Sequence, residues 1–227
     1  MPEHAPQPVR IPLGHLSLHA DLRLPKDAIG LIVFAHGSGS SRKSARNRLV
    51  ADQLGHHGFA TLLLDLLTVE EAVVDDVTAQ YRFDIPRLGQ RVTGAIDWIV
   101  MRPDLKHLPV GLFGASTGAA AALVAAAARP AIVRAVVSRG GRPDLAGDAL
   151  LTVMAPSLFL VGGDDVEVIT LNEAAAERMR GVVEIEIVPG ATHLFEEPGT
   201  LEHVAASAAA WFESYLPVHR PMAVPSE

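Results

Sequence analysis

VGLFGASTG, residues 110–118, is the stretch that decides the expected fold and chemistry of this chain. Its apolar first half predicts a buried strand, and the alanine-rich segment after it predicts a helix. A serine on a sharp turn between the two has a strained backbone, so the residues two before and two after it must be small. Gly114 and Gly118 meet that requirement. The bare Gly-x-Ser-x-Gly pattern also occurs in ordinary turns, but the flanking strand and helix favour Ser116 as a nucleophile.

The composition sets the class of protein. The 227 residues are 49% hydrophobic and 20% charged, which predicts a well-packed α/β domain. The net charge of −7 gives no reason to expect nucleic acid or an anionic membrane as a partner. The absence of cysteine excludes disulfides, thiolate metal sites and a cysteine nucleophile. With no recognisable signal peptide and no apolar run long enough for a membrane span, we expect a cytoplasmic protein. We expect neither a metal nor a cofactor.

Strands and helices alternate along the chain without a break in composition. Residues 1–12 contain four prolines and are expected to form a flexible lead-in, and residues 217–227 a loose tail. Residues 13–24 predict a half-buried strand or hairpin, and residues 66–81 a long loop with at most a short helix. The remaining elements are strands at 31–35, 60–64, 110–113, 133–137, 157–161 and 183–188, and helices at 44–57, 84–101, 171–179 and 198–215. This alternation predicts one domain, residues 13–216, with a mostly parallel sheet and helices on both faces.

In such a sheet, the loops at the carboxyl ends of the strands converge on one site. A serine hydrolase of this architecture needs its nucleophile, acid and base in the chain order Ser, Asp or Glu, His. Of the ten histidines, only His193, His203 and His219 follow the candidate acids. His203 is expected inside the last helix and His219 in the tail, whereas His193 follows a buried strand directly. We therefore predict His193 as the general base.

Two aspartates compete for the acid. Asp164 and Asp165 both follow the strand at 157–161, after a pair of glycines that allows a sharp turn. We prefer Asp165, with Asp164 as the alternative. The two carboxylates could instead only cap the next segment, as turn aspartates often do.

An oxyanion hole in this mechanism uses the backbone N–H after the nucleophile and one from a loop after an earlier strand. Here those groups are Thr117 and Ser38, the latter between Gly37 and Gly39. The small glycine-rich loop allows backbone donors to approach a substrate closely.

Five motifs in one order resemble the dienelactone hydrolase-like branch of the α/β-hydrolase superfamily: HGSGSS, GASTG, VVSRGGRPDLAG, VGGDD and GATHLFEEPG. The resemblance covers residues 31–215 and implies an α/β-hydrolase fold with minimal or no lid. It also implies a Ser116–Asp165–His193 triad that cleaves an ester or lactone of a small substrate. The namesake enzymes carry cysteine at the position of Ser116, so the resemblance favours a simpler carboxylic ester over dienelactone itself.

Two arginines stand near the same edge of the predicted sheet. Arg139 and Arg142 flank a pair of glycines after the strand at 133–137, where they could clamp a substrate carboxylate. The alternative is that they form salt bridges to Asp144 or Asp148.

Two other classes of function compete with the hydrolase. Gly37, Gly39 and Asp65 resemble part of a dinucleotide fingerprint, and Lys43-Ser44 resembles part of a phosphate loop. Arg42 occupies the position at which each of these motifs requires a glycine. The third possibility is a small-molecule binding protein that keeps the hydrolase fold without turnover.

Overall fold

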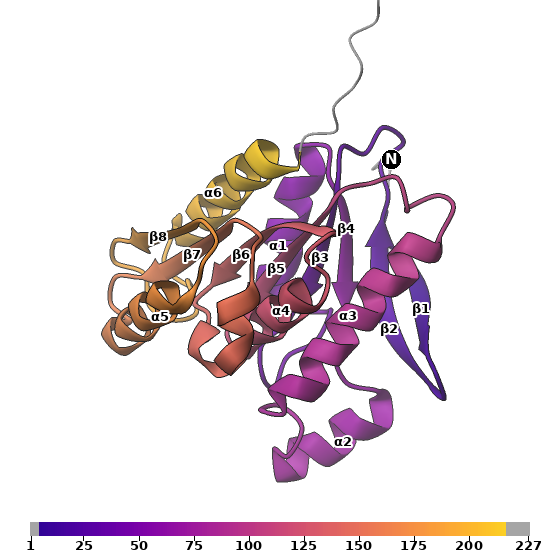
Figure 1. Cartoon of the computed structure of the whole chain (residues 1–227), viewed down its shortest axis with the longest axis horizontal. Coiled ribbons are helices and arrows are strands. Elements are labelled where there is room, and N and C mark those ends of the chain that lie inside the picture. Colours follow the sequence, from indigo (N-terminus) through magenta and orange to yellow (C-terminus); the bar gives the residue numbers. More distant parts are fainter. Residues whose placement is uncertain (1–4, 217–227) are drawn as a thin grey trace, which may run out of the picture.

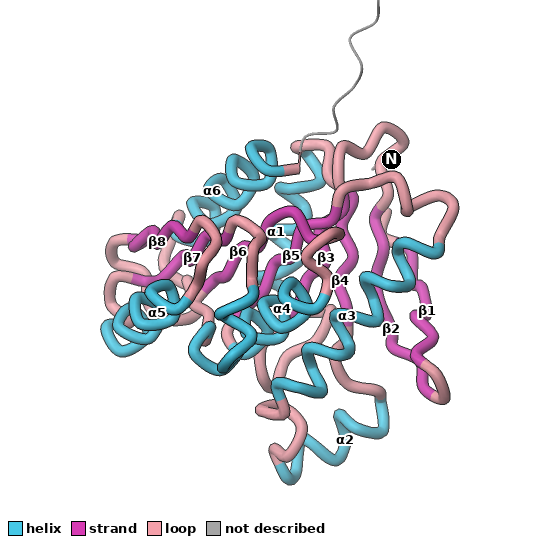
Figure 2. Tube along the Cα trace, in the orientation of Figure 1, coloured by secondary structure: helices cyan, strands magenta, loops and turns pink. Residues whose placement is uncertain are grey.

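A single eight-stranded sheet forms the centre of the computed structural model, which describes residues 5–216. Strands β3 to β8 are parallel, and β1 and β2 join the sheet antiparallel beside β4, in the order β1-β2-β4-β3-β5-β6-β7-β8. Figure 2 shows this sheet running through the molecule with helices on either side. The strands are β1 Gln7–Leu13, β2 Leu16–Arg23, β3 Leu31–Ala35, β4 Ala60–Leu64, β5 Val110–Ala115, β6 Val133–Arg139, β7 Ser157–Gly162 and β8 Val183–Val188.

Helices cover both faces of the sheet, as the alternating pattern predicts (Figure 1). One face carries α1 Ala45–His56 and α6 Thr200–Tyr215. The other carries α3 Ile85–Met101, α4 Thr117–Ala128 and α5 Val166–Arg178, together with the 3-10 segment η1 Pro143–Thr152. The remaining helix, α2 Val69–Thr78, projects from the body beside α3.

The core has two layers because every central strand is buried on both faces. In β3, Leu31, Val33 and Ala35 pack into one apolar cluster, whereas Ile32 and Phe34 pack into the other. All five side chains are almost fully buried. Burial of each large apolar side chain contributes about 1.5–3 kcal/mol relative to exposure, so a continuous apolar run is what a doubly covered strand requires.

The expected lead-in at residues 1–12 is wrong for its second half. Residues 7–13 form β1, which pairs with β2 in an antiparallel hairpin. Gly14 occupies the turn with φ of +63°, a conformation that glycine adopts without strain. Pro8 and Pro12 are tolerated because β1 lies at the edge of the sheet, where one side of the strand needs no partner. Residues 1–4 of the lead-in and the whole tail, 217–227, lie outside the described residues.

Three helical segments differ from the sequence expectation. The region expected as a loop at 66–81 contains α2, whose capping box joins Thr68 and Glu71. Helix α5 begins at residue 166 rather than 171, because β-branched residues dominate its first turn and lower the apparent helix propensity. Segment η1 was not expected. No helix in the described part of the chain is long and apolar enough to cross a bilayer.

Candidate active site

Ser116 occupies a strained turn between β5 and α4. Its φ and ψ are 51° and −124°, outside the regions that a residue with a side chain normally adopts. Two glycines make the turn sterically possible. A Cβ on Gly114 would lie 2.4 Å from Ala119 Cα, and a Cβ on Gly118 would lie 2.2 Å from the Ala35 carbonyl oxygen. The Gly-x-Ser-x-Gly spacing is therefore required by the packing of α4 against β5 and the end of β3.

The backbone of Ser116 is held on both sides, while its hydroxyl is not. Its N–H donates to the Arg139 carbonyl at 3.2 Å, and its carbonyl accepts from Arg142 N–H at 3.1 Å. Although Ser116 is the N-cap of α4, its side chain makes no capping hydrogen bond. The half-buried hydroxyl is thus presented at the N-terminal end of α4, where the helix dipole favours a developing negative charge.

Asp165 and His193 form a direct pair. Asp165 Oδ2 lies 2.7 Å from His193 Nδ1. This bond fixes the proton of neutral imidazole on Nδ1 and leaves Nε2 as the acceptor. Asp165 is the N-cap of α5, but its side chain makes no capping bond, so the alternative of a merely capping aspartate does not describe it. Asp164 is exposed and makes no such contact with His193.

The loop that carries His193 packs against the loop after β6. A Cβ on Gly140 would lie 2.8 Å from the His193 carbonyl oxygen and 3.6 Å from His193 Nδ1. Gly140 follows Arg139, whose carbonyl holds Ser116, so the structure brings the three predicted residues to neighbouring loops at one edge of the sheet. Among the described residues, Asp165 and His193 are hydrogen-bonded to each other, whereas no hydrogen bond joins Ser116 Oγ to His193.

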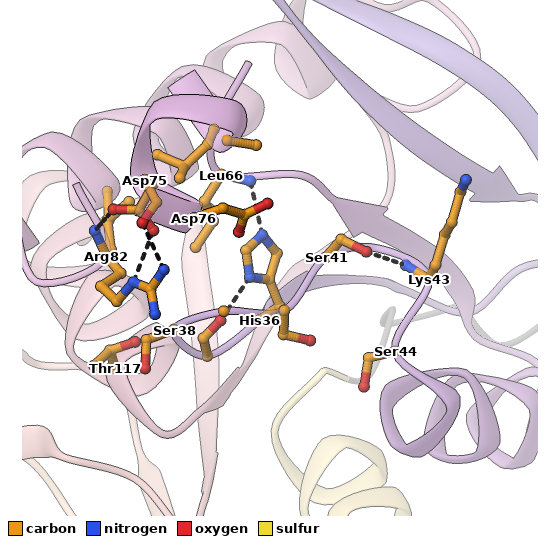
Figure 3. Close-up of a pocket in the computed structure, with 16 residues that line it drawn as sticks. His36, Ser38, Ser41, Lys43, Ser44, Leu66, Asp75, Asp76, Arg82 and Thr117 are labelled. Carbon is orange, nitrogen blue, oxygen red and sulfur yellow. Dashed lines mark hydrogen bonds and ion pairs between the residues drawn. The ribbon is translucent and has the colours of Figure 1, made fainter. Parts of the chain in front are cut away.

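The glycine-rich loop after β3 lies against the serine. A Cβ on Gly37 would approach Ser116 Cβ to 3.0 Å. Next to this contact, Ser38 and Thr117 line a cavity of about 420 Å³ (Figure 3). Within residues 5–216, the backbone N–H groups of Ser38 and Thr117 donate to no protein acceptor, and α4 offers none to its first residue. Ser38 and Thr117, whose N–H groups are the predicted oxyanion donors, therefore line one cavity together with Gly37, whereas Ser116, Asp165 and His193 are not among its lining residues.

His36 holds that loop in place, a role that the sequence did not indicate. Leu66 N–H donates to His36 Nε2 at 3.0 Å, and His36 Nδ1 lies 2.8 Å from the Gly37 carbonyl oxygen. Burial lowers the pKa of His36, against the opposing effects of its Gly37 hydrogen bond and Asp65. The neutral ring with its proton on Nδ1 satisfies both bonds and joins the end of β3 to the segment after β4.

The far wall of the cavity comes from α2 and the segment after it. Asp75, buried in α2, accepts from Arg82 Nε at 2.8 Å and from the backbone N–H groups of Tyr81 and Arg82. Figure 3 shows the Arg82 guanidinium above Ser38 and Thr117, on the side opposite Ser41 and Ser44. The sequence did not indicate this wall, because residues 66–81 were expected to form a long loop with at most a short helix, although Thr68-x-x-Glu71 is a sequence signature of a helix start.

Arg139, at the end of β6, and Arg142, in the loop after it, have different environments. Arg142 donates to both oxygens of Asp144, at 2.9 and 2.8 Å, which is one of the salt bridges the sequence offered as an alternative. Asp148 pairs instead with Arg178. Arg139 is only 6% exposed and has neutral acceptors alone. The carboxylate clamp remains a prediction for both.

Burial changes the titration of Arg139. Desolvation, and then repulsion by Arg46, lowers the pKa of its guanidinium to about 10, so the group stays charged at neutral pH. The difference from the ordinary value corresponds to about 3 kcal/mol against the charged form, from burial and repulsion by Arg46 together.

The nucleotide-binding alternative loses its acidic residue. Asp65 accepts from the backbone N–H of Arg42 at 2.7 Å and forms an ion pair with the Arg42 guanidinium. The carboxylate that a dinucleotide fingerprint would direct to a ribose is thus occupied by the residue that replaces the required glycine.

Comparison with known proteins identifies the family. A model of the dienelactone hydrolase family matches residues 18–216. The chain belongs to the dienelactone hydrolase family. The structure of a dienelactone hydrolase from Anabaena variabilis is 54% identical, with a TM-score of 0.91, and the match covers 94% of this chain and 100% of that one. The esterase domain of a Rhodothermus marinus protein has the same fold at 19% identity, with a TM-score of 0.74 over 93% of this chain and 99% of that domain.

A longer relative carries a different name. A Mycobacterium tuberculosis protein named "Putative phosphoribosyl transferase" is 53% identical over 208 residues, which are 92% of the present chain. The match covers 46% of that protein, so the chain spans about half the length of the curated relatives it matches.

Proposed function

We propose that this chain is a serine hydrolase that cleaves a carboxylic ester or lactone of a small substrate through an acyl-enzyme. The observation that carries the proposal is the Asp165 carboxylate, which lies 2.7 Å from His193 Nδ1 instead of capping α5. A neighbouring loop presents Ser116 in a strained turn, with its hydroxyl outside any cap. Family membership supports hydrolysis as the reaction class.

In the first half of the reaction, His193 Nε2 takes the proton of Ser116 Oγ as that oxygen bonds to the substrate carbonyl carbon. The carbonyl oxygen becomes an oxyanion and accepts hydrogen bonds from the Ser38 and Thr117 N–H groups. The bond to the leaving alcohol oxygen then breaks, and that oxygen takes the proton from His193. General-base assistance of this kind is worth about 10²–10⁴-fold in rate.

In the second half, water attacks the acyl carbon and transfers a proton to His193. The bond to Ser116 Oγ breaks, the proton returns to this oxygen, and the carboxylic acid leaves. Asp165 holds the imidazole in the required tautomer and stabilises the imidazolium in both halves. Catalytic hydrogen bonds often form only with substrate bound, which reconciles the proposal with the unpaired Ser116 hydroxyl.

The size of the cavity lined by Ser38 and Thr117 favours a substrate with a small acyl or alcohol group. Its volume of about 420 Å³ lies at the lower end of small-molecule sites, and serine hydroxyls and charged groups line much of it. A serine at the elbow favours a simple carboxylic ester over dienelactone. The transferase name of the M. tuberculosis relatives belongs to proteins about twice as long as the matched region, so our proposal rests on the serine site.

A non-catalytic binding protein is the second candidate. The missing hydrogen bond between Ser116 Oγ and His193 is the observation that favours it. Such a protein would bind an ester stoichiometrically and release it unchanged.

Labelling with a fluorophosphonate probe tests the proposal without a known substrate, because only an activated serine reacts rapidly. We expect stoichiometric labelling of the wild-type chain at Ser116 and hydrolysis of short p-nitrophenyl esters. Ser116→Ala should abolish labelling and reduce kcat by at least about 10³-fold. Ser214→Ala, which changes an exposed hydroxyl on α6, is the matched control. Undiminished hydrolysis by Ser116→Ala would rule out the proposal, and binding without turnover by the wild type would favour the second candidate.

A further inference from the structure

Arg139 is a buried cation that the proposed reaction does not use. Its side chain is almost completely enclosed, its Nε has no hydrogen-bond partner, and no carboxylate of the described residues pairs with it. A buried charge without a counterion destabilises a fold, so its presence requires an explanation other than stability.

The two ends of Arg139 contact the two halves of the proposed catalytic site. Its backbone carbonyl accepts the N–H of Ser116 at 3.2 Å. Its guanidinium Nη1 donates to the carbonyl oxygen of Leu194 at 3.4 Å, and Leu194 directly follows His193. Arg139 therefore touches both the nucleophile and the segment carrying the base.

The surroundings of the guanidinium fix it in place. Nη2 donates to Asn47 Oδ1, on α1, at 3.4 Å. On another side the cation lies over the ring of Phe195, 5.9 Å from its centre. Phe195 has a φ of +56°, so the segment after His193 is itself held in an uncommon backbone conformation. Arg46 binds Glu196 at 2.9 Å, which ties the same segment to α1 a second time.

We propose that Arg139 is a positioning residue that sets the separation of Ser116 and His193 by holding the His193–Leu194 segment through the Leu194 carbonyl. This inference rests on the proposed hydrolase function. A displacement of about 1 Å between reacting groups can reduce a rate by about 10²-fold. Arg139 differs here from the substrate clamp suggested by the sequence, because its hydrogen bonds are directed to protein atoms.

The test is Arg139→Met, which keeps much of the side-chain volume but removes the charge and both donors. We expect kcat for a neutral p-nitrophenyl ester to fall by about 10- to 100-fold, with KM within about 3-fold of wild type. We expect Tm to equal or exceed the wild-type value, because the unpaired buried charge is gone. Expressing kcat per serine titrated with fluorophosphonate removes any contribution from unfolded protein. Arg139→Lys, which restores the charge without the planar fork, should recover part of kcat.

Arg178→Met is the matched control, because Arg178 lies on α5 in an exposed ion pair with Asp148. It should leave kcat and KM unchanged. A kcat of Arg139→Met within about 3-fold of wild type, or a loss confined to KM or to acidic esters, would overturn the inference. If the wild-type serine fails to label at all, the proposed function fails, independently of this comparison.

Discussion

At the scale of single residues, Asp165 is the most informative side chain of the site. Aspartate at an N-cap usually accepts a backbone hydrogen bond worth about 1 kcal/mol, yet Asp165 makes none. Its Oδ2 faces His193 instead. The chain therefore forgoes a local stabilising bond in favour of orienting an imidazole, which is the arrangement expected where function and stability compete.

Replacing this carboxylate should disrupt catalysis and little else. In Asp165→Asn, the amide no longer favours the tautomer with the proton on Nδ1, so Nε2 loses its role as acceptor. We expect kcat for short p-nitrophenyl esters to fall by about 10³–10⁴-fold, with little change in KM. Asp164→Asn is the control and should retain activity within about 2-fold. A larger loss in Asp164→Asn than in Asp165→Asn would move the acid assignment to Asp164.

At the scale of elements, the strained turn at Ser116, here called the elbow, depends on how closely α4 approaches the end of β3. Gly118 lies so close to this strand end that a Cβ would meet the carbonyl oxygens of Ala35 at 2.2 Å and His36 at 2.5 Å. These atoms belong to the backbone, so they cannot move aside without displacing β3 or the loop that carries Ser38. The second glycine of the motif is therefore a packing requirement between elements.

Gly118→Ala should consequently lower both stability and activity. We expect a loss of more than about 2 kcal/mol in unfolding free energy, measured by urea denaturation, because overpacking against fixed backbone is costly. The same change at Gly55, within α1, serves as a comparison. There the nearest atoms belong to the flexible Arg23 side chain, so Gly55→Ala should be neutral or gain up to about 1 kcal/mol from helix propensity. Equal effects at the two positions would refute this account of the elbow.

The elements that the sequence predicted well are those with one dominant pattern. The apolar runs of β3, of β4 and of the first four residues of β5 leave little choice, because such runs suit strands covered on both faces. The start of α5 was misplaced because Val166 and the β-branched residues after it resemble a strand locally. Helix α2 was expected only as a possible short helix within a long loop, because its valines face solvent and no buried stripe marks it.

At the scale of the whole molecule, the parallel sheet explains how distant residues meet. Loops after β3, β5, β6, β7 and β8 end at one edge, which is why chain order and strand ends alone indicated Ser38, Ser116, Asp165 and His193. The sequence could not decide between Asp165 and Asp164. The directions of two adjacent side chains in a turn depend on backbone angles, which the spacing of residues does not reveal. The environment of Arg139 could not be predicted from the sequence either, because it combines atoms of β6, α1 and the segment after His193.

His36 joins the ends of two neighbouring strands, β3 and β4, at this edge. His36 is only 7% exposed, and its ring links the Gly37 carbonyl, after β3, to the Leu66 backbone, after the neighbouring strand β4. Protonation of Nε2 would replace the acceptor of Leu66 N–H with a donor. Folding is therefore coupled to the neutral state of this ring, and the coupling should appear in the pH dependence of global stability.

The sign of that dependence follows from the lowered pKa of His36, which burial causes. Below about pH 6.5, the ordinary histidine value, the unfolded chain takes up a proton that the folded chain does not yet bind. Stability from this group is therefore complete above pH 6.5 and is lost as the pH falls toward the folded pKa, with a slope of at most about 1.4 kcal/mol per pH unit. His36→Asn, whose side-chain oxygen can still accept a hydrogen bond, should flatten the urea-derived stability profile between pH 6.5 and 5. His56→Gln, at an exposed position in α1, should leave the slope as in the wild type. An unchanged slope in His36→Asn would show that acid sensitivity arises elsewhere in the fold.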